Sequence, residues 1–238
     1  MNDELPIKST FKAYDIRGVV GSELTPPIVK KIGQAIGTMA LSQNQKTICV
    51  GYDGRLSSPT LSLTLIDGLV STGIDVINIG LCTTPMLYFS TFHQATGTGV
   101  MVTGSHNPPE YNGFKIVVNE KTLFSDDIQT LYKAILNSNY LKGKGKCKER
   151  SLSIKSDYLD EISNSIKLKR PMRVAIDCGN GAGGVCAEEL FKKLGVETEP
   201  LFCDVDGNFP NHHPDPSNPK NLLDLKNALK NGDSELGL

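Results

Sequence analysis

Short apolar runs alternate along this chain with longer segments of helical periodicity, and this alternation limits what the chain can fold into. Four runs rich in β-branched and aliphatic residues are predicted to be strands, at residues 48–52, 76–79, 99–102 and 114–118. Three further segments are predicted to be helices, at residues 26–41, 59–72 and 85–94. Strands that alternate with helices are typical of layered α/β folds.

Each of these predicted helices has a proline near its start. Proline suits the first helical turn because its fixed φ is already helical and the N–H that it lacks would have no partner there. The residues before the three prolines carry hydroxyl groups and are expected to cap the helices: Thr25, Ser58 and Thr84.

Residues 141–150 lose the apolar periodicity and alternate lysine with glycine. We interpret them as a solvated linker rather than as an anion-binding patch. Beyond them we expect helices at residues 154–168, 182–194 and 222–229 and strands at residues 173–177 and 197–203. Residues 235–238 are expected to approach another strand. The chain is therefore predicted to form two tandem three-layer α/β/α domains with mixed sheets, at residues 1–145 and 152–238, with the second incomplete.

Composition excludes several classes of partner. The 25 basic residues nearly balance the 26 acidic ones, for a net charge of −1, which favours a small molecule over nucleic acid. No apolar run approaches the length of a membrane span, and the acidic start has no signal-peptide pattern, so we expect a cytoplasmic protein. Six cysteines without a Cys-x-x-Cys pair indicate reduced thiols rather than disulfides or a zinc site.

The stretch at residues 103–115 places a serine, a histidine and a lysine close together on a turn-rich loop and the start of the strand after it. One interpretation is an ordinary hairpin, because Asn107-Pro108-Pro109 and Asn112-Gly113 are residues typical of turns. The other is a phosphate site, in which backbone N–H groups and Lys115 surround an anion and Ser105 carries the phosphoryl group. A phosphoserine carries about −1.5 to −2 charges, so it would need nearby cations or a metal.

Two arginines are candidates for those cations. Arg17 is either a phosphate ligand or half of an exposed Arg–Asp pair with Asp15. Arg55 follows a predicted strand, at the edge of the sheet where α/β folds bind ligands, but the string Asp53-Gly54-Arg55 also suits a simple turn before a helix.

The second predicted domain contains a Gly-x-Gly-x-x-Gly string at residues 179–184, after a strand and before a helix. This is the setting of a dinucleotide site, with Asp204 or Glu199 as the ribose ligand, although a tight strand-to-helix turn explains it as well. Residues 204–208 begin like a calcium loop but lack its glycine and its final glutamate. His212 and His213 have no zinc spacing and are interpreted as loop residues.

Taken together, the strings at residues 14–18, 51–55, 103–108 and 113–115 resemble the α-D-phosphohexomutases, in particular the bacterial phosphomannomutase/phosphoglucomutase branch. Residues 177–183 and 206–216 are similar to the second domain of that family, so the resemblance covers essentially the whole chain. It implies a phosphotransferase that interconverts hexose 1-phosphate and hexose 6-phosphate, with mannose or glucose as the sugar.

The resemblance also implies roles for individual residues. Ser105 matches the phosphorylated serine, whose phosphate would contact Mg²⁺, and Lys115 and Arg17 match catalytic cations that also bind substrate. Tyr14, His106 and Asn107 match residues of the substrate site. A hexose 1,6-bisphosphate would be the activating intermediate. The glycine-rich turn becomes a packing feature, because the family uses no nicotinamide.

Two departures from the family accompany the resemblance. Gly104 stands where alanine is more usual, which is expected to add backbone freedom. The aspartate-rich metal loop of the family's second domain, and its third and fourth domains, do not occur in these residues, so we expect an incomplete and inactive fragment. Phosphoglucosamine mutase, or a non-catalytic half-protein that binds a sugar phosphate or a nucleotide, are the alternatives, and the oligomeric state is open.

Overall fold

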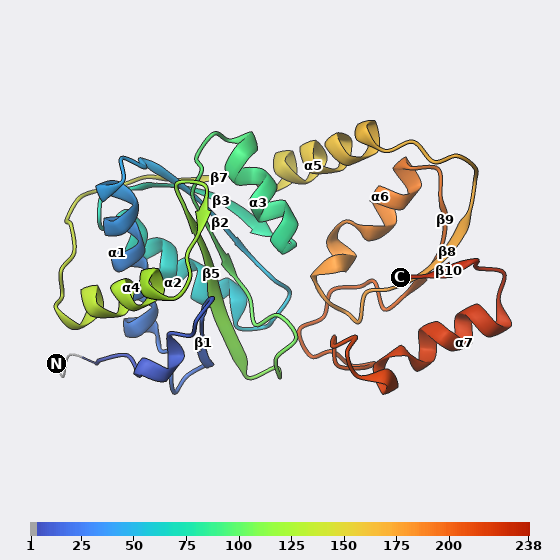
Figure 1. The fold of residues 1–238 in the computed structure, drawn as a ribbon, viewed down its shortest axis with the longest axis horizontal. Helices are drawn as coiled ribbons and strands as arrows, with labels where there is room; N and C mark the ends of the chain where they lie inside the picture. Colours follow the sequence, from blue (N-terminus) through green and yellow to red (C-terminus); the bar gives the residue numbers. More distant parts are fainter. Residues whose placement is uncertain (1–3) are drawn as a thin grey trace.

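The computed structural model describes residues 4–238 and has two α/β units side by side (Figure 1). The first unit is built on a mixed sheet with strand order β1-β5-β4-β2-β3-β7, and β6 pairs with β5 at one end. Its strands are β1 (Ile16–Val19), β2 (Thr47–Tyr52), β3 (Asp75–Leu81), β4 (Gly99–Val102), β5 (Tyr111–Val118), β6 (Lys121–Thr122) and β7 (Cys147–Glu149). β2, β3, β4 and β7 run parallel, whereas β5 runs antiparallel to β1 and β4.

Helices cover both faces of this sheet. The helices of the unit are α1 (Pro26–Ser42), α2 (Ser58–Val70), α3 (Thr84–His93), α4 (Asp126–Leu136) and α5 (Ser151–Ser165), with a short 3₁₀ turn η1 (Lys8–Thr10) before them. Apolar residues of α1, α2 and α4 share one core with β2, β4 and β5, and those of α3 and α5 share a second core on the opposite face. The predicted three-layer α/β/α arrangement is therefore confirmed for this unit.

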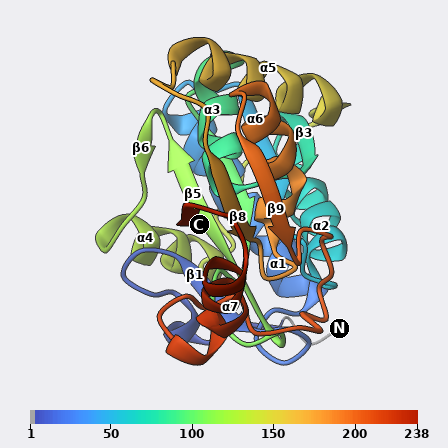
Figure 2. The same cartoon turned by 90° about the vertical axis from the view of Figure 1, so that its right-hand side faces the viewer.

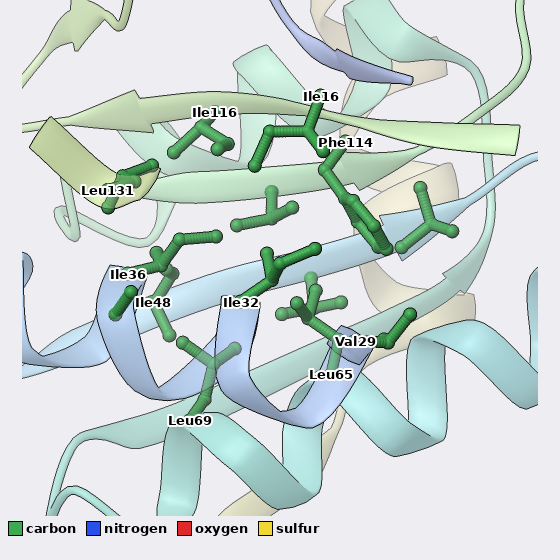
Figure 3. Packing of buried hydrophobic residues seen from close by; sticks show 14 of the residues in the cluster. Ile16, Val29, Ile32, Ile36, Ile48, Leu65, Leu69, Phe114, Ile116 and Leu131 are labelled. Atoms are coloured by element: carbon green, nitrogen blue, oxygen red, sulfur yellow. The ribbon is translucent and has the colours of Figure 1, made fainter. Parts of the chain in front are cut away.

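The larger core forms because α1 is apolar at helical spacing. Val29, Ile32 and Ile36 are fully or almost fully buried and point at Phe114 and Ile48 of the sheet (Figure 3). α1 and α2 approach closely because glycine stands at the crossing, where a Cβ on Gly33 would overlap the carbonyl of Leu65. The apolar face of α1 thus determines how the helical layer packs on the sheet.

The second unit contains a smaller parallel sheet of strand order β10-β8-β9. Its elements are β8 (Arg173–Asp177), the 3₁₀ turn η2 (Ala182–Val185), α6 (Ala187–Lys193), β9 (Glu197–Leu201), the 3₁₀ turn η3 (Pro219–Leu222), α7 (Leu223–Asn231) and β10 (Leu236–Gly237). α6 contacts β9 and α7 contacts β8 and β10, while α5 contacts α3, β3 and α6 and so bridges the two units (Figure 2). The three strands described here are all parallel, whereas the first sheet is mixed.

Most predicted elements are confirmed within a few residues, but the capping prediction needs correction. Thr83, not Thr84, caps α3, because its hydroxyl accepts the N–H of Met86 at 3.3 Å. Ser58 lies inside α2 rather than before it, and Thr25 precedes α1 without a side-chain capping bond. The predicted helix at 182–194 is divided into η2 and α6, and Gly184 in η2 permits a close approach to Cys203, whose carbonyl a Cβ there would overlap.

The predicted linker at 141–150 is wrong for its final residues. Cys147–Glu149 forms β7, which extends the first sheet beside β3. The glycines before it permit close approach, because a Cβ on Gly145 would overlap the carbonyl of Ile74 and one on Gly143 would lie 2.7 Å from Gly73 Cα. The N–H groups of Gly143 and Gly145 donate to the carbonyls of Ser71 and Val70 at 2.9 and 2.8 Å. The alternating lysines project from a segment that is bound to the domain surface.

Candidate active site

Ser105 lies on the loop that joins β4 to the antiparallel β5, as the hairpin interpretation expects. Its backbone has φ 53, a left-handed conformation that is uncommon for a residue with a side chain. The N–H of Ser105 donates to Thr103 Oγ1 at 2.9 Å, and the N–H of Asn107 donates to the carbonyl of Gly104 at 3.0 Å. This tight turn leaves the serine hydroxyl exposed.

Arg55 is the internal support of that loop. Its side chain is 2% exposed, and its guanidinium lies beneath the turn. Nη1 donates to the carbonyls of Pro108 and Tyr111 at 2.7 and 3.0 Å, and Nη2 donates to those of Ser105 and Asn107 at 2.8 and 2.6 Å. Both terminal nitrogens are therefore used by the protein itself, so Arg55 holds the loop rather than a ligand.

Asp53 completes this support from the end of β2. One of its carboxylate oxygens accepts from Ser58 Oγ at 2.5 Å, and the other accepts from Thr103 Oγ1 at 2.7 Å and from the N–H of Gly104 at 3.1 Å. Arg55 Nε lies 3.4 Å from the second oxygen. Burial lowers the pKa of the Arg55 guanidinium, and the charge of Asp53 opposes that shift.

Two glycines in this region make close contacts. Gly104 does not use left-handed backbone freedom, since it is absent from the positive-φ glycines in residues 4–238; a Cβ there would instead overlap the Arg55 guanidinium. Asn112 and Gly113 do not form a turn but lie in β5. The Asn112 amide donates to Ser57 and Ser58 hydroxyls at 2.8 Å each, and Gly113 leaves room for the carbonyl of Ile16.

The predicted cations Arg17 and Lys115 meet at Asp15. Arg17, on β1, donates to the Asp15 carboxylate, and Lys115, on β5, has its Nζ 3.9 Å from the same oxygen. Asp15 is 6% exposed, whereas Tyr14 beside it is 75% exposed. These four residues line one open cavity together with Lys12 and Ala13. The antiparallel pairing of β1 with β5 is what brings them together.

Ser105 itself opens into a second cavity, of about 300 Å³, between the two units. The first unit contributes Asp53, Arg55, Thr83 and Thr103 to its walls, and the second contributes Cys178, Gly181, Phe209 and Pro214, among others. His106 Nδ1 lies 3.4 Å from Ser105 Oγ, which is too long for a strong hydrogen bond. The amide of Asn107 donates to the Gly104 carbonyl at 2.8 Å, so this side chain is used within the loop.

The glycine-rich turn at residues 178–184 is a packing element rather than an open phosphate cradle. The N–H groups of Gly179 and Asn180 donate to Asp177 Oδ1 and the carbonyl of Phe202, and those of Gly181 and Gly184 donate to carbonyls inside the turn. Because these donors are already used, the dinucleotide interpretation loses its physical basis.

His212 contacts Asp177, which lies at the end of β8. Its Nε2 is 2.9 Å from one carboxylate oxygen of Asp177, and its Nδ1 is 3.0 Å from the carbonyl of His213. Burial disfavours the charged ring, but the carbonyl and the carboxylate together outweigh it and raise the pKa of His212. Both ring nitrogens face acceptors, which stabilises the imidazolium.

All six cysteines are free thiols. Burial raises the pKa of Cys82 to about 12, so this thiol is a core residue without nucleophilic character. Within residues 4–238, no group of three or more His, Cys, Asp or Glu side chains is arranged to hold a metal ion. The same residues contain no helix with both the length and the apolar character to cross a membrane.

Both units of the chain match sequence models of a known protein family. Residues 8–142 match the sequence model of the phosphoglucomutase/phosphomannomutase α/β/α domain I, and residues 156–238 match that of α/β/α domain II. The chain therefore belongs to the phosphoglucomutase/phosphomannomutase family, as the motifs predict.

Curated relatives and a solved structure agree with this assignment. A phosphoglucomutase of Neisseria meningitidis is 49% identical over 97% of this chain and 50% of its own length. A phosphomannomutase/phosphoglucomutase of Pseudomonas aeruginosa is 47% identical over 97% of this chain and 49% of its own length. The crystal structure of a family protein from Burkholderia thailandensis has a TM-score of 0.94 and 42% identity, over 98% of this chain and 52% of that one. The chain thus spans about half the length of the relatives that it matches.

Sequence reasoning did not identify the supporting residues of the site. The sequence places Asp53 and Asp15 in strings that resemble the family but assigns them no supporting role, whereas in the structure both are buried and lie beside cations. A buried carboxylate needs partners, so an aspartate directly after an apolar strand is the signal that could have identified Asp53.

Proposed function

We propose that this chain carries the phosphoserine-bearing part of a phosphohexomutase, which interconverts the 1-phosphate and 6-phosphate of a hexose, mannose or glucose. The observation that carries the proposal is the presentation of Ser105. Its hydroxyl is exposed on a left-handed turn, and that turn is tied through four carbonyl contacts to the buried Arg55. A nucleophile held this rigidly favours in-line phosphoryl transfer, in which positioning contributes much of the rate.

In the proposed reaction, the bond between phosphorus and Ser105 Oγ breaks as a sugar hydroxyl forms a new bond to phosphorus. The bisphosphorylated sugar then turns over and returns its other phosphate to Ser105, so the enzyme's phosphorus content is unchanged. A hexose 1,6-bisphosphate is therefore the activating intermediate. Arg17 and Lys115 are assigned to the sugar phosphate, and Lys115 to the proton that the sugar hydroxyl loses.

Asp15 gives these two cations a common anchor, since its buried carboxylate faces both of them. Tyr14 is exposed at the mouth of the same cavity and is assigned to sugar binding together with His106 and the Asn107 turn.

Mg²⁺ is the metal that the family implies, and it prefers oxygen ligands. The ligand that we assign in this chain is the phosphate on Ser105. Among residues 4–238, no group of three or more His, Cys, Asp or Glu side chains is arranged to complete that ligand set. We accordingly propose low turnover for the 238-residue chain on its own.

The test separates the phosphoryl half-reaction from complete turnover. The chain is incubated with glucose 1,6-bisphosphate and Mg²⁺ and examined by intact mass and peptide mapping. We expect one added phosphoryl group on Ser105, and none in Ser105→Ala. Ser217→Ala is the matched control, because this serine is also exposed but is bonded to Asp215 away from the cavity. Phosphorylation elsewhere, or none, would favour a non-catalytic binding protein.

A further inference from the structure

One loop of the second unit reaches across to the Ser105 loop, and nothing in the proposed chemistry yet uses it. In Figure 1 the orange-red segment before α7 lies beside the green hairpin of β4 and β5. His213 Nε2 is 2.7 Å from the carbonyl oxygen of His106, the residue after Ser105. A carbonyl only accepts hydrogen bonds, so the His213 nitrogen carries the proton and donates it.

Phe209 makes a second contact from the same loop. Its ring lies 5.7 Å from the Arg55 guanidinium, and the ring of His213 meets it edge-on, with centroids 6.3 Å apart. Phe209 has φ 50, which is a strained backbone conformation for a bulky residue. Its N–H donates to the carbonyl of Asp206 at 3.0 Å within the same loop, and its ring extends to the arginine that supports the Ser105 loop.

The two backbones also touch at this point. A Cβ on Gly207 would lie 2.6 Å from both the carbonyl oxygen of Gly54 and the N of Leu56. A Cβ on Gly54 would in turn overlap the side chain of Val205. Glycine on each side therefore permits contact between this loop and the turn that carries Arg55.

The loop is itself held rigidly by the glycine-rich turn. Asn180 is 5% exposed and bonds four different points of the loop. It donates to the carbonyls of Phe202 and Asp204 at 2.8 Å each, and it accepts from Asp206 N at 3.0 Å and from the Asn211 amide at 2.8 Å. The glycine-rich turn at residues 178–184, whose spacing resembles a dinucleotide site, therefore holds this loop in place.

We propose that His213 and Phe209 are positioning residues for the Ser105 loop. Arg55 holds the loop from within the first unit, and His213 and Phe209 hold it from the second. Neither side chain touches the serine hydroxyl; each acts through the backbone of His106 or through Arg55. The effect on phosphoryl transfer rests on the proposed function, whereas the effect on loop order does not.

The test compares His213→Ala with His213→Gln, whose amide N–H can replace the lost donor. His93→Ala is the matched control, because His93 is a surface residue of α3 paired with Asp157. Hydrogen exchange of the peptide 103–111 is expected to become several-fold faster in His213→Ala, to be largely restored in His213→Gln, and to be unchanged in His93→Ala.

The phosphorylation of Ser105 by glucose 1,6-bisphosphate gives the second readout. In His213→Ala we expect the maximal rate to fall about 10-fold to 100-fold, with the half-saturating concentration little changed, because positioning rather than binding is lost. Phe209→Leu should show the same pattern more weakly. Urea unfolding of each variant identifies any loss of fold.

Unchanged exchange in a folded His213→Ala chain would overturn the inference, as would a glutamine variant that behaves like alanine in both readouts. Faster exchange together with absent phosphorylation in the unaltered chain would keep the positioning role and reject the proposed mutase instead. The two failures are therefore distinguishable.

Discussion

Replacing Arg55 with methionine tests whether one buried guanidinium holds the Ser105 loop. Methionine keeps most of the aliphatic volume but removes the donors to four loop carbonyls and the charge opposite Asp53. Asp53 is 8% exposed, so its carboxylate would be left buried without its cation. Breaking a buried pair in this way costs about 3–5 kcal/mol. That is a large part of a typical stability of about 5–15 kcal/mol.

The assay is urea unfolding followed by far-UV circular dichroism, with hydrogen exchange of residues 103–111 in the folded state. Arg55→Lys should lose about 1–3 kcal/mol, since lysine keeps the charge but lacks the planar fork that reaches several carbonyls at once. Arg170→Met is the control, because Arg170 forms an exposed pair with Glu235 and should matter much less.

A decrease of less than about 1 kcal/mol in the unfolding free energy of Arg55→Met would refute this role of Arg55, because an exposed ion pair already contributes that much. Rapid exchange spread over the whole chain, without a specific change at residues 103–111, would show that the arginine supports the fold in general and not the loop.

Three other predictions concern stability. Folding raises the pKa of His212, so the protonated ring stabilises the folded chain. This stabilisation is fully present below about pH 6.5 and is lost as pH rises through the higher folded pKa. The difference in unfolding free energy between the unaltered chain and His212→Gln should therefore be larger at about pH 6 than at about pH 9. Phe114→Ala should lose about 3–5 kcal/mol in urea unfolding, because this ring is fully buried, whereas Leu152→Ala, at a residue 86% exposed, should change stability by less than about 0.5 kcal/mol. Gly145→Ala should lower the free energy of unfolding by about 1–3 kcal/mol, because the new Cβ would overlap the carbonyl of Ile74. An unchanged thermal midpoint would mean that residues 141–146 are a solvated linker.

The sequence predicted the strands and helices that carry a clear period. β4 and β8 were placed at their observed bounds, and α1 within one residue, because buried strands are short apolar runs and α1 has an uninterrupted apolar face. β1 and β7 were not predicted. Each is short, β7 is exposed throughout, and each exists because a neighbouring strand offers hydrogen bonds to it.

For the site, the sequence supplied the residue types and their order, which was sufficient for the family. Ser105, Arg17 and Lys115 were selected as chemical groups without knowledge of their neighbours. Arg55 could not be assigned, because a ligand-binding arginine and a loop-supporting arginine look identical in sequence. Its role depends on carbonyls fifty or more positions away in the chain.

The sequence by itself determined that this chain forms layered α/β units, that it belongs to the phosphohexomutases, and which serine is the candidate for phosphorylation. Only the tertiary structure decided what surrounds that serine. Asp15 unites two cations from antiparallel strands, and His213 reaches the carbonyl of His106 from another unit. Local patterns record the period and propensity of neighbouring residues, whereas these contacts arise where distant segments meet, and their geometry is fixed only when the whole core is packed.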